Sequence, residues 1–506
     1  MTTINRQSPE GFTHIWPDPQ VDAHSSNGTR TDAPSGTHAS QSFQPLHIPT
    51  DAPAWSRTTL RQRTLWLKRV RHNLVSHAEP LTSLIAQESH KSDWEAFTGD
   101  LLPLLAACRW HERCAARILS PRRLRGRPFW LPGQRWHLAH MPIGTVGIIA
   151  TWNYPVQLLG VQLLQALFAG NRVVVKPSER TPRTQALLCK LFDDGLLPQG
   201  TLRIWPAGRD FGPQMLRSEP FDHIVFTGST SVGREVATWA AERLIPTTLE
   251  LSGHDSAIVL ADADAGLAAR SIWNAVTMNS GQTCMAPRRV LVEESIYPQF
   301  IAALAPLTAG SPARELIDMT AASHAFSLVQ QSLARGARSL SGTLEPPSGS
   351  TFHPICLVDC PADSPLVIGD HFSPCLAVLP VRNAEHALSI HRSFGQHLST
   401  SIFTRIPAHA HKLAHQLGVS LITINDCVIP TGHPAVGIAP FGSSGWGVTR
   451  GELGLLAMSR PVQIARTSPW LRTPTDPPTS ALASRIRRFA LRWYARGTLE
   501  NRPQPK

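Results

Sequence analysis

The stretch GQTCMAPRR, residues 281–289, places one thiol, Cys284, between a flexible run and two arginines. A cysteine thiolate can attack a carbonyl carbon and form a covalent intermediate. An isolated cysteine is more often a small buried residue, because free cysteine is among the most buried residue types. Taken alone, the stretch leaves both interpretations of Cys284 open.

Two other polar residues end apolar runs that are typical of strands. Glu250 lies in TTLELSG, and Asn153 lies in TWNYP directly after VGIIA. A carboxylate at such a place is costly to bury without a role or a partner, and an amide there can donate a hydrogen bond to an oxyanion. A thiol, a carboxylate and an amide could therefore converge on one carbonyl group.

Two further motifs suit a phosphate or a sugar. FTGSTSVG places Gly228, Ser229 and Gly233 between a strand and a helix, where free N–H groups and the helix dipole favour a phosphate. The spacing differs from GxGxxG, so a plain tight turn is an equally good interpretation. VVVKPSE brings Lys176 and Glu179 to the end of a strand, where they can bond sugar hydroxyls or be two solvated charges.

The elements that must position these residues alternate along the chain. Helical periodicity is expected over 55–118, 156–170 and 180–195. Short apolar runs that predict strands, some with the turn that follows, occupy 146–150, 171–179, 202–208, 223–233, 247–253 and 256–262. The alternation predicts βαβ units and a parallel, doubly wound sheet. In such sheets ligands gather at the carboxyl ends of the strands.

Composition narrows the class of protein. The 506 residues suggest two or three domains, and the eight cysteines show no zinc-ligand spacing, which favours a reducing compartment. The net charge of +12 is peripheral, because residues 51–140 carry fifteen Lys and Arg against seven acids, and residues 461–506 carry nine against two. A basic face with base-reading partners is missing from the middle of the chain, so we expect no nucleic-acid partner.

In chain order, seven motifs resemble those of the NAD(P)-dependent aldehyde dehydrogenase superfamily, over about residues 55–460. They are TWNYP, KPSE, FTGSTSVG, LELSG, GQTCMAPRR, DHFSP and PFGSSGWG. The resemblance implies an α/β fold with a Rossmann-type cofactor domain, an α/β catalytic domain and a small oligomerisation hairpin. The expected divisions are a disordered extension 1–50, a dinucleotide-binding domain 51–251 with the hairpin at 121–141, a catalytic domain 252–440, a closing segment 441–467 and a basic tail 468–506.

The same resemblance implies a role for each candidate residue. Cys284 is the nucleophile that adds to an aldehyde, Asn153 and the Cys284 backbone N–H stabilise the oxyanion, and Glu250 activates water for thioester hydrolysis. Hydride passes to NAD, with NADP as the alternative, and no metal is expected. The implied cofactor-binding residues are Trp152, Lys176, Ser178, Glu179, Gly228, Ser229, Gly233, Leu251, Asp370 and Phe372.

Some stretches depart from the family pattern. GDHFSP stands where EExFGP is usual, so Asp370 replaces a longer glutamate, and PFGSSGWG is about three residues short. A non-catalytic binding or scaffold protein with this fold is therefore the alternative to an enzyme that acts on a small-molecule aldehyde. The presence of Cys284, Glu250 and Asn153 favours the enzyme. The resemblance also implies a homodimer, through residues 121–141 and the strand after Gly454.

The tail predicts a helix over 480–497. Leu482, Ile486, Phe489 and Trp493 fall on one helical face, and five arginines surround it. A basic helix with an aromatic stripe is typical of peripheral contact with an anionic membrane, although packing on the chain itself or on a partner subunit, or a disordered tail, is also consistent. We expect a cytoplasmic protein, with membrane association through this helix as the open question.

Overall fold

The computed structural model describes residues 54–342, 344–471 and 478–496. These residues belong to one unit, Pro49–Lys506. The prediction of disorder for residues 1–50 lies outside the described part. Among the described helices, none is long and apolar enough to cross a membrane.

The first sheet has six strands in the order β19-β7-β6-β3-β4-β5. Their bounds are β3 (Thr145–Ile149), β4 (Arg172–Lys176), β5 (Leu202–Ile204), β6 (His223–Thr227), β7 (Thr247–Glu250) and β19 (Gly445–Trp446). All neighbours run parallel except β19, which is antiparallel to β7. The chain goes outward from β3 to β4 and β5 and then returns to β6 on the other side of β3. The switch point therefore lies between β3 and β6, which confirms the doubly wound prediction.

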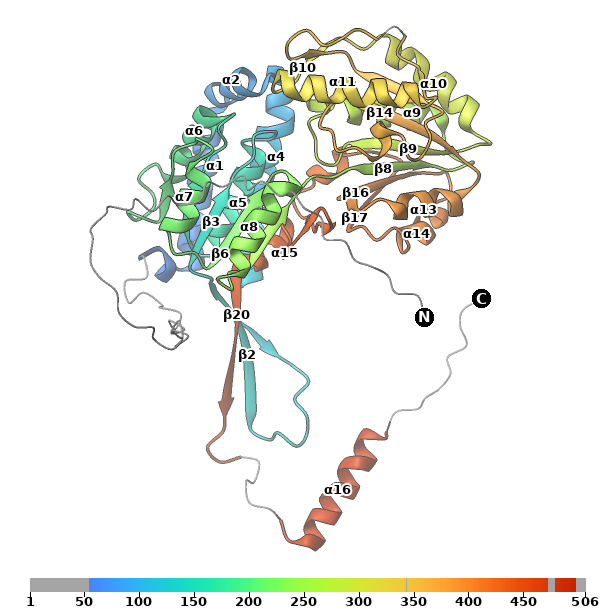
Figure 1. Cartoon of the computed structure of the whole chain (residues 1–506). Coiled ribbons are helices and arrows are strands. Elements are labelled where there is room, and N and C mark those ends of the chain that lie inside the picture. Colours follow the sequence, from blue (N-terminus) through green and yellow to red (C-terminus); the bar gives the residue numbers. More distant parts are fainter. Residues whose placement is uncertain (1–53, 343, 472–477, 497–506) are drawn as a thin grey trace, which may run out of the picture. The chain divides into compact units, whose positions relative to one another are not determined.

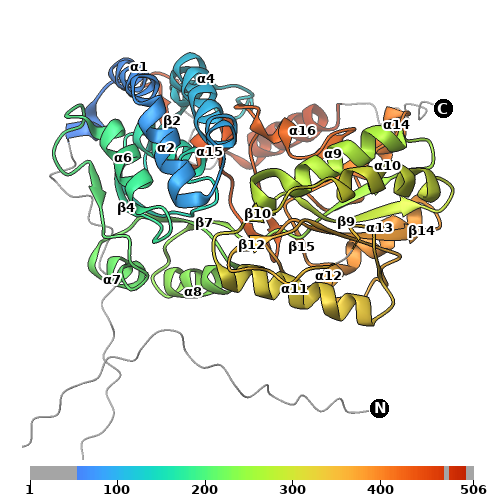
Figure 2. The same cartoon turned by 90° about the horizontal axis from the view of Figure 1, so that it is seen from above.

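Helices cover both faces of this sheet, as Figures 1 and 2 show. They are α1 (Leu60–Ser76), α2 (Ala78–Ser89), α3 (Asp93–Glu95), a π-helical turn (Ala96–Leu101), α4 (Leu102–Leu119), α5 (Gln157–Phe168), α6 (Pro182–Asp193), α7 (Phe211–Ser218) and α8 (Thr230–Ala241). Successive residues of a strand point to opposite faces. Accordingly Val173 and Val175 join the core under α1, α4, α5 and α6, whereas Val174 joins the core under α7 and α8.

The second sheet has seven strands in the order β11-β13-β14-β9-β8-β16-β17. Their bounds are β8 (Asp255–Val259), β9 (Pro287–Glu293), β11 (Arg338–Ser339), β13 (Ile355–Val358), β14 (Cys375–Val381), β16 (Ser399–Phe403) and β17 (Leu421–Ile424). Neighbours are parallel except β11 and β13. The flanking helices are α9 (Ala265–Thr277), α10 (Tyr297–Ala309), α11 (Met319–Ala334), α12 (Pro365–Ile368), α13 (Ala384–Ser393) and α14 (Pro407–Ala414).

Three short antiparallel sheets complete the fold. Two are pairs, β10 (Arg314–Glu315) with β12 (Thr351–Phe352) and β15 (Gln396–His397) with β18 (Phe441–Gly442). The third contains β1 (Arg122–Leu124), β2 (Gln134–Pro142) and β20 (Ser459–Thr467). The predicted hairpin is thus present as β1 and β2, and its predicted partner is β20, which follows α15 (Gly451–Ala457).

The predicted tail helix is confirmed as α16 (Ser480–Tyr494). It meets the tip of the hairpin, where the ring of Phe129 lies 5.4 Å from that of Phe489 and 5.6 Å from that of Trp493. The Trp130 indole also donates a hydrogen bond to the Tyr494 hydroxyl at 3.1 Å. None of the residues of α16 is buried by these contacts. The helix therefore contacts the hairpin through Phe489 and Trp493, while its apolar residues stay about half exposed.

Candidate active site

A single pocket brings together all three predicted catalytic residues, Asn153, Glu250 and Cys284. It lies at the carboxyl ends of β3, β6 and β7, and Cys284 enters it from the loop before β9 of the second sheet. Six of the predicted cofactor residues also line it, namely Trp152, Gly228, Ser229, Leu251, Asp370 and Phe372. The switch point of the first sheet and the loop before β9 thus build one site.

Glu250 is the last residue of β7, and strand pairing supplies its neighbours. Thr227 is opposite it on β6, and the Thr227 hydroxyl lies 3.5 Å from one carboxylate oxygen. The hydroxyl of Thr449, beyond β19, donates to the other oxygen. Burial raises the pKa of Glu250, while the charge of Arg450 and these hydroxyls oppose that rise. The arrangement holds a carboxylate ready to accept a proton.

The sequence did not single out the residues that hold Glu250. Gln162 of α5 is buried, and its amide donates to the Thr227 hydroxyl at 3.0 Å. The available signal was that Gln162 is one of three glutamines in the apolar run VQLLGVQLLQALF. Thr227 and Thr449 carried no such signal, because their role depends on which strands lie next to β7.

The loop that carries Cys284 has an unusual backbone. Asn279, Ser280 and Gly281 have φ values of 52°, 54° and 74°, a region that residues with a Cβ rarely occupy. A Cβ on Gly281 would meet the backbone of Ser373 and Pro374 at 2.3 Å. Such strain persists only where the surroundings fix the segment, and it clusters at functional sites. The loop is therefore pressed against the GDHFSP stretch.

A buried arginine secures this loop. The guanidinium of Arg288 donates to the carbonyl oxygens of Gly281 at 2.6 Å, Thr283 at 3.0 Å and Ser373 at 2.7 Å. Burial lowers the pKa of Arg288 to about 10, so it remains charged near neutral pH. The first arginine of GQTCMAPRR thus holds the loop that carries Cys284 in place.

The Asn153 side chain points at the same loop. Its Nδ2 donates to the Gln282 carbonyl oxygen at 3.1 Å, and its Oδ1 accepts from the Thr151 hydroxyl at 3.2 Å. The Asn279 amide donates in return to the Asn153 carbonyl oxygen at 2.9 Å. These bonds fix which way the amide faces. The bond to Gln282 uses one N–H of Nδ2, and the other N–H is the donor that the predicted oxyanion role requires.

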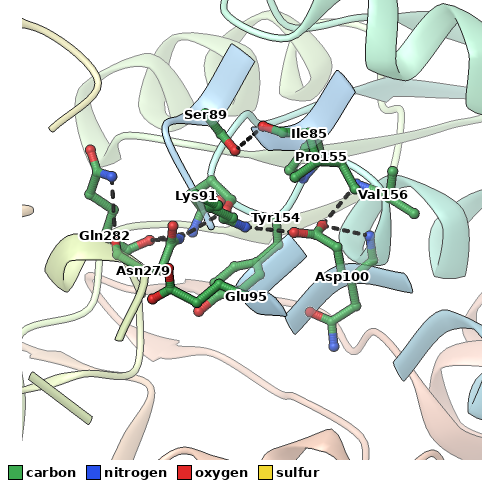
Figure 3. A network of polar contacts seen from close by, with 12 residues as sticks. Ile85, Ser89, Lys91, Glu95, Asp100, Tyr154, Pro155, Val156, Asn279 and Gln282 are labelled. Carbon is green, nitrogen blue, oxygen red and sulfur yellow. Dashed lines mark hydrogen bonds and ion pairs between the residues drawn. The ribbon is translucent and has the colours of Figure 1, made fainter. Parts of the chain in front are cut away.

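A polar network around Lys91, Asp100 and Tyr154 ties the segment that follows Asn153 to the helical layer (Figure 3). Lys91 and Asp100 form a buried ion pair at 2.6 Å, and Asp100 also accepts from the backbone N–H groups of Val156 and Gln157 at 3.0 and 3.1 Å. Lys91 lies 4.1 Å from the ring centre of Tyr154. Asp100 therefore caps the start of α5 and fixes the segment that carries Asn153.

The same network contacts the loop that carries Cys284 through Tyr154. The Tyr154 hydroxyl lies 2.6 Å from that of Thr283, the residue directly before Cys284. Burial raises the pKa of Tyr154, so its hydroxyl stays protonated. The contact joins the loop after β3 to the loop before β9.

Cys284 differs from most of the other cysteines. All eight thiols are free, and only Cys114 and Cys284 are not buried. Burial within the pocket raises the pKa of Cys284 to about 12, and the negative charges of Glu250 and Asp255 add to the rise. Arg450 and Arg288 act in the opposite direction. The thiol therefore needs positive charge to become a thiolate.

The pocket suits the nicotinamide end of a dinucleotide. Gly228 and Ser229 lie at the start of α8, where the Ser229 hydroxyl accepts the Val232 N–H, and a helix start of this kind binds phosphate. The Trp152 and Phe372 rings meet edge to face, with centres 5.7 Å apart. The helix start and the aromatic walls fit a phosphate and a planar ring.

The other predicted cofactor residues lie outside this pocket. Lys176 is the last residue of β4 and is buried. Its ammonium lies 3.2 Å from a carboxylate oxygen of Glu179. Arg209 pairs with the other oxygen of Glu179 at 3.1 Å. Sequence reasoning missed Arg209, because its contact with Glu179 depends on how β4 and β5 lie together.

Two of the predicted cofactor residues have structural contacts. The Ser178 hydroxyl accepts the Arg180 N–H at 3.2 Å and thus shapes the turn after β4. A Cβ on Gly233 would lie 2.2 Å from the Leu251 side chain, so this glycine lets α8 approach β7. Their contact with a cofactor stays a prediction.

Comparison with known proteins gives a consistent result. The sequence model of the aldehyde dehydrogenase family matches residues 23–464. A 4,4'-diapolycopene aldehyde oxidase of Methylomonas sp is 30% identical over 417 residues, 81% of this chain and 78% of that protein. A 4,4'-diapolycopene-4,4'-dial dehydrogenase of Cytobacillus firmus is 30% identical over 414 residues, 79% of this chain and 89% of that protein.

A solved structure gives the same picture. An aldehyde dehydrogenase of Mycobacterium tuberculosis, complexed with NAD+, is 26% identical, with a TM-score of 0.76 over 82% of this chain and 86% of that one.

Among the described residues, no group of three His, Cys, Asp or Glu side chains could hold a metal ion. No observation favours the non-catalytic alternative.

Proposed function

Because this chain belongs to the aldehyde dehydrogenase family and oxidises aldehydes with NAD(P), we propose that the reaction passes through a thiohemiacetal and a thioester on Cys284. The observation that carries the proposal is the meeting of Cys284, Glu250 and Asn153 in one pocket. Splitting the oxidation into two covalent steps lowers each barrier.

The first step joins the substrate to Cys284. The thiolate adds to the aldehyde carbon, and the carbonyl oxygen becomes an oxyanion that accepts from the Asn153 amide and the Cys284 backbone N–H. A nicotinamide held by Trp152, Phe372 and the start of α8 would supply the acceptor for the hydride that leaves that carbon. Restoring the carbonyl then leaves an acyl group on the sulfur. Fixed donors of this kind contribute about 3–4 kcal/mol to such steps.

The second step releases the acid. Glu250 takes a proton from a water molecule, whose oxygen adds to the thioester carbon. The carbon–sulfur bond breaks, the carboxylic acid leaves and Cys284 is regenerated. The hydroxyls of Thr227 and Thr449 aim the carboxylate.

We propose NAD as the preferred cofactor over NADP. Glu179 can accept a hydrogen bond from a free 2′-hydroxyl and would repel a 2′-phosphate. Lys176 and Arg209 neutralise part of the charge of Glu179. The preference for NAD over NADP therefore depends on Glu179 keeping its place beside the 2′ position. Gly228, Ser229, Trp152 and the Asp370–Phe372 stretch would hold the rest of the molecule.

We also propose a homodimer built on the strand β20. This strand lies at one edge of the sheet β1-β2-β20, and an open edge is a template for pairing with a second copy. Ile464 on it is 54% exposed. Light scattering should give twice the monomer mass, and Ile464→Lys should shift the mass toward the monomer. A monomeric wild-type protein at micromolar concentration would contradict the proposal.

Peripheral membrane contact through α16 is a further part of the proposal, in a protein that we place in the reducing cytoplasm. The apolar face of α16 is about half exposed and lies among arginines, an arrangement that suits anionic lipid. Its apolar residues are Leu482, Ile486, Phe489 and Trp493, and its arginines are Arg485, Arg487, Arg488 and Arg492.

Vesicle sedimentation tests this contact. The full chain should sediment with vesicles that contain anionic lipid and should be released by added salt, since salt screens exposed charges. A chain that ends at residue 470 should remain in the supernatant. Neutral vesicles are the control. Equal sedimentation of the full and the shortened chain would contradict the proposal that α16 binds the membrane.

The substrate that fits best is a long apolar aldehyde. Leu158, Leu398 and Ile438 line the pocket, two relatives are named for diapolycopene aldehydes, and a membrane-bound enzyme can draw such a substrate from a bilayer. An aldehyde panel read by absorbance of the reduced cofactor tests this. Long aliphatic aldehydes should exceed short, aromatic and carboxylate-bearing ones in kcat/KM with either NAD or NADP.

A further inference from the structure

Arg450 occupies an unexpected position in the active-site pocket. It follows Thr449 directly, precedes α15 and lines the pocket together with Glu250 and Cys284. Its side chain is buried, and its φ of 63° is rare for a residue with a Cβ. Strain of this kind persists where the fold requires one particular placement.

The guanidinium of Arg450 has few protein partners. It donates one hydrogen bond, at 3.3 Å, to the Thr431 carbonyl oxygen, and its buried Nε has none. The buried guanidinium groups of Arg288 and Arg289 donate three hydrogen bonds each. Arg450 therefore has donors to spare beside the reacting groups.

A buried arginine without a counter-ion is costly. Arginine stays protonated in proteins, and a charge removed from water needs an opposite charge or full hydrogen bonding. No carboxylate among the described residues lies within 4 Å of Arg450, since none pairs with it. The counter-charge must come from an anion in the pocket.

The proposed reaction needs two such anions, the Cys284 thiolate that attacks the aldehyde and the Glu250 carboxylate that takes a proton from water. The charged groups that act on Cys284 are Glu250 and Asp255, which disfavour the thiolate, and Arg450 and Arg288, which favour it. Arg288 donates three hydrogen bonds to backbone carbonyls, whereas Arg450 donates one. Arg450 is also the first of the groups that lower the pKa of Glu250 against its burial.

We propose that Arg450 is a positioning residue whose free positive charge stabilises both the thiolate form of Cys284 and the carboxylate form of Glu250 in the dry pocket. The inference rests on the proposed function, since it acts through those two residues. The other anion that could face Arg450 is a carboxylate on the substrate, which a long apolar aldehyde lacks.

Alkylation of Cys284 by iodoacetamide tests the proposal without turnover. Rates between pH 7 and 10, followed by mass spectrometry of the peptide that holds Cys284, report the thiolate population. A rise of one pKa unit lowers the thiolate tenfold, and greater nucleophilicity recovers about threefold of it. Arg450→Met and Arg450→Gln should therefore slow alkylation by roughly threefold or more, whereas Arg450→Lys should keep most of the rate.

Kinetics supply the second measurement. With a neutral aldehyde, the two uncharged variants should lose kcat with little change in KM, because the substrate makes no contact with Arg450. Arg69→Met is the matched control, since Arg69 is exposed on α1, and it should leave both values unchanged. Circular dichroism before the assay shows that each variant is folded.

Three outcomes are distinguishable. Alkylation within 1.5-fold of wild type in both uncharged variants would overturn the role of Arg450. Unchanged alkylation with a raised KM only for carboxylate-bearing aldehydes would reassign it to substrate binding. If Cys284→Ala retains turnover, the proposed function itself fails, whatever Arg450 does.

Discussion

Replacing Glu250 by glutamine should separate the two halves of the reaction. The glutamine side chain keeps the shape of glutamate, so its carbonyl oxygen can accept from the Thr449 hydroxyl, and its amide can face Thr227, 3.5 Å away. The change removes the ability to accept a proton, together with a negative charge that raises the pKa of Cys284. Hydride transfer should proceed in the variant, and hydrolysis of the thioester should stall.

The size of the effect follows from the role. A positioned general base contributes about 10²–10⁴-fold, which corresponds to about 3–5 kcal/mol at 1.36 kcal/mol per tenfold change. Steady-state turnover of Glu250→Gln should fall by this factor. The first turnover should stay within a few fold of wild type.

Loss of folding does not explain such a result. Burial raises the pKa of Glu250. The free energy of unfolding therefore falls as the pH rises above the pKa that Glu250 has in the unfolded chain, because the unfolded state then ionises more readily than the folded state. Glutamine carries no such cost, and Glu250→Gln should be at least as stable as wild type at pH 8. Thermal unfolding of both proteins checks this.

The assay is stopped-flow absorbance of the reduced cofactor with the best aldehyde of the panel. Glu250→Gln should give a burst of one equivalent per active site followed by a slow phase, and mass spectrometry should find the acyl group on Cys284. Cys284→Ala is the control and should give no burst while it still binds the cofactor. Normal steady-state turnover with an unmodified Cys284 would refute the assignment of the base.

Three other perturbations follow from the contacts. Thr449→Val removes a hydrogen bond that lowers the pKa of Glu250, so the acid limb of the kcat profile should move to higher pH, and an unmoved limb would contradict the contact. Glu179→Gln should raise kcat/KM with NADP relative to kcat/KM with NAD. If this ratio equals that of the wild type, Glu179 does not set the cofactor preference. Asp100→Asn leaves the buried Lys91 without its partner, which should cost roughly 3–5 kcal/mol in urea unfolding. A loss below about 1 kcal/mol would mean that Lys91 is neutral in the folded protein.

Local sequence determined much of the frame. Alternating apolar runs and helical periodicity predicted β3, β4, β6 and the helices between them, because side-chain period depends only on neighbouring residues. The same reasoning brought Asn153, Gly228 and Glu250 to the ends of strands, where a parallel sheet gathers its ligands. Motif order then indicated the family and the nucleophile.

Tertiary structure alone decided how the site works. The switch point between β3 and β6 depends on strand order, and Cys284 reaches it from the other sheet. The partners of Glu250 come from β6 and from Thr449, about 200 positions along the chain, and Arg450 enters the pocket through a left-handed backbone turn. Hydrogen bonds, burial and charge act through space, so residues distant in sequence set the pKa values of Glu250 and Cys284, and no local pattern encodes that proximity.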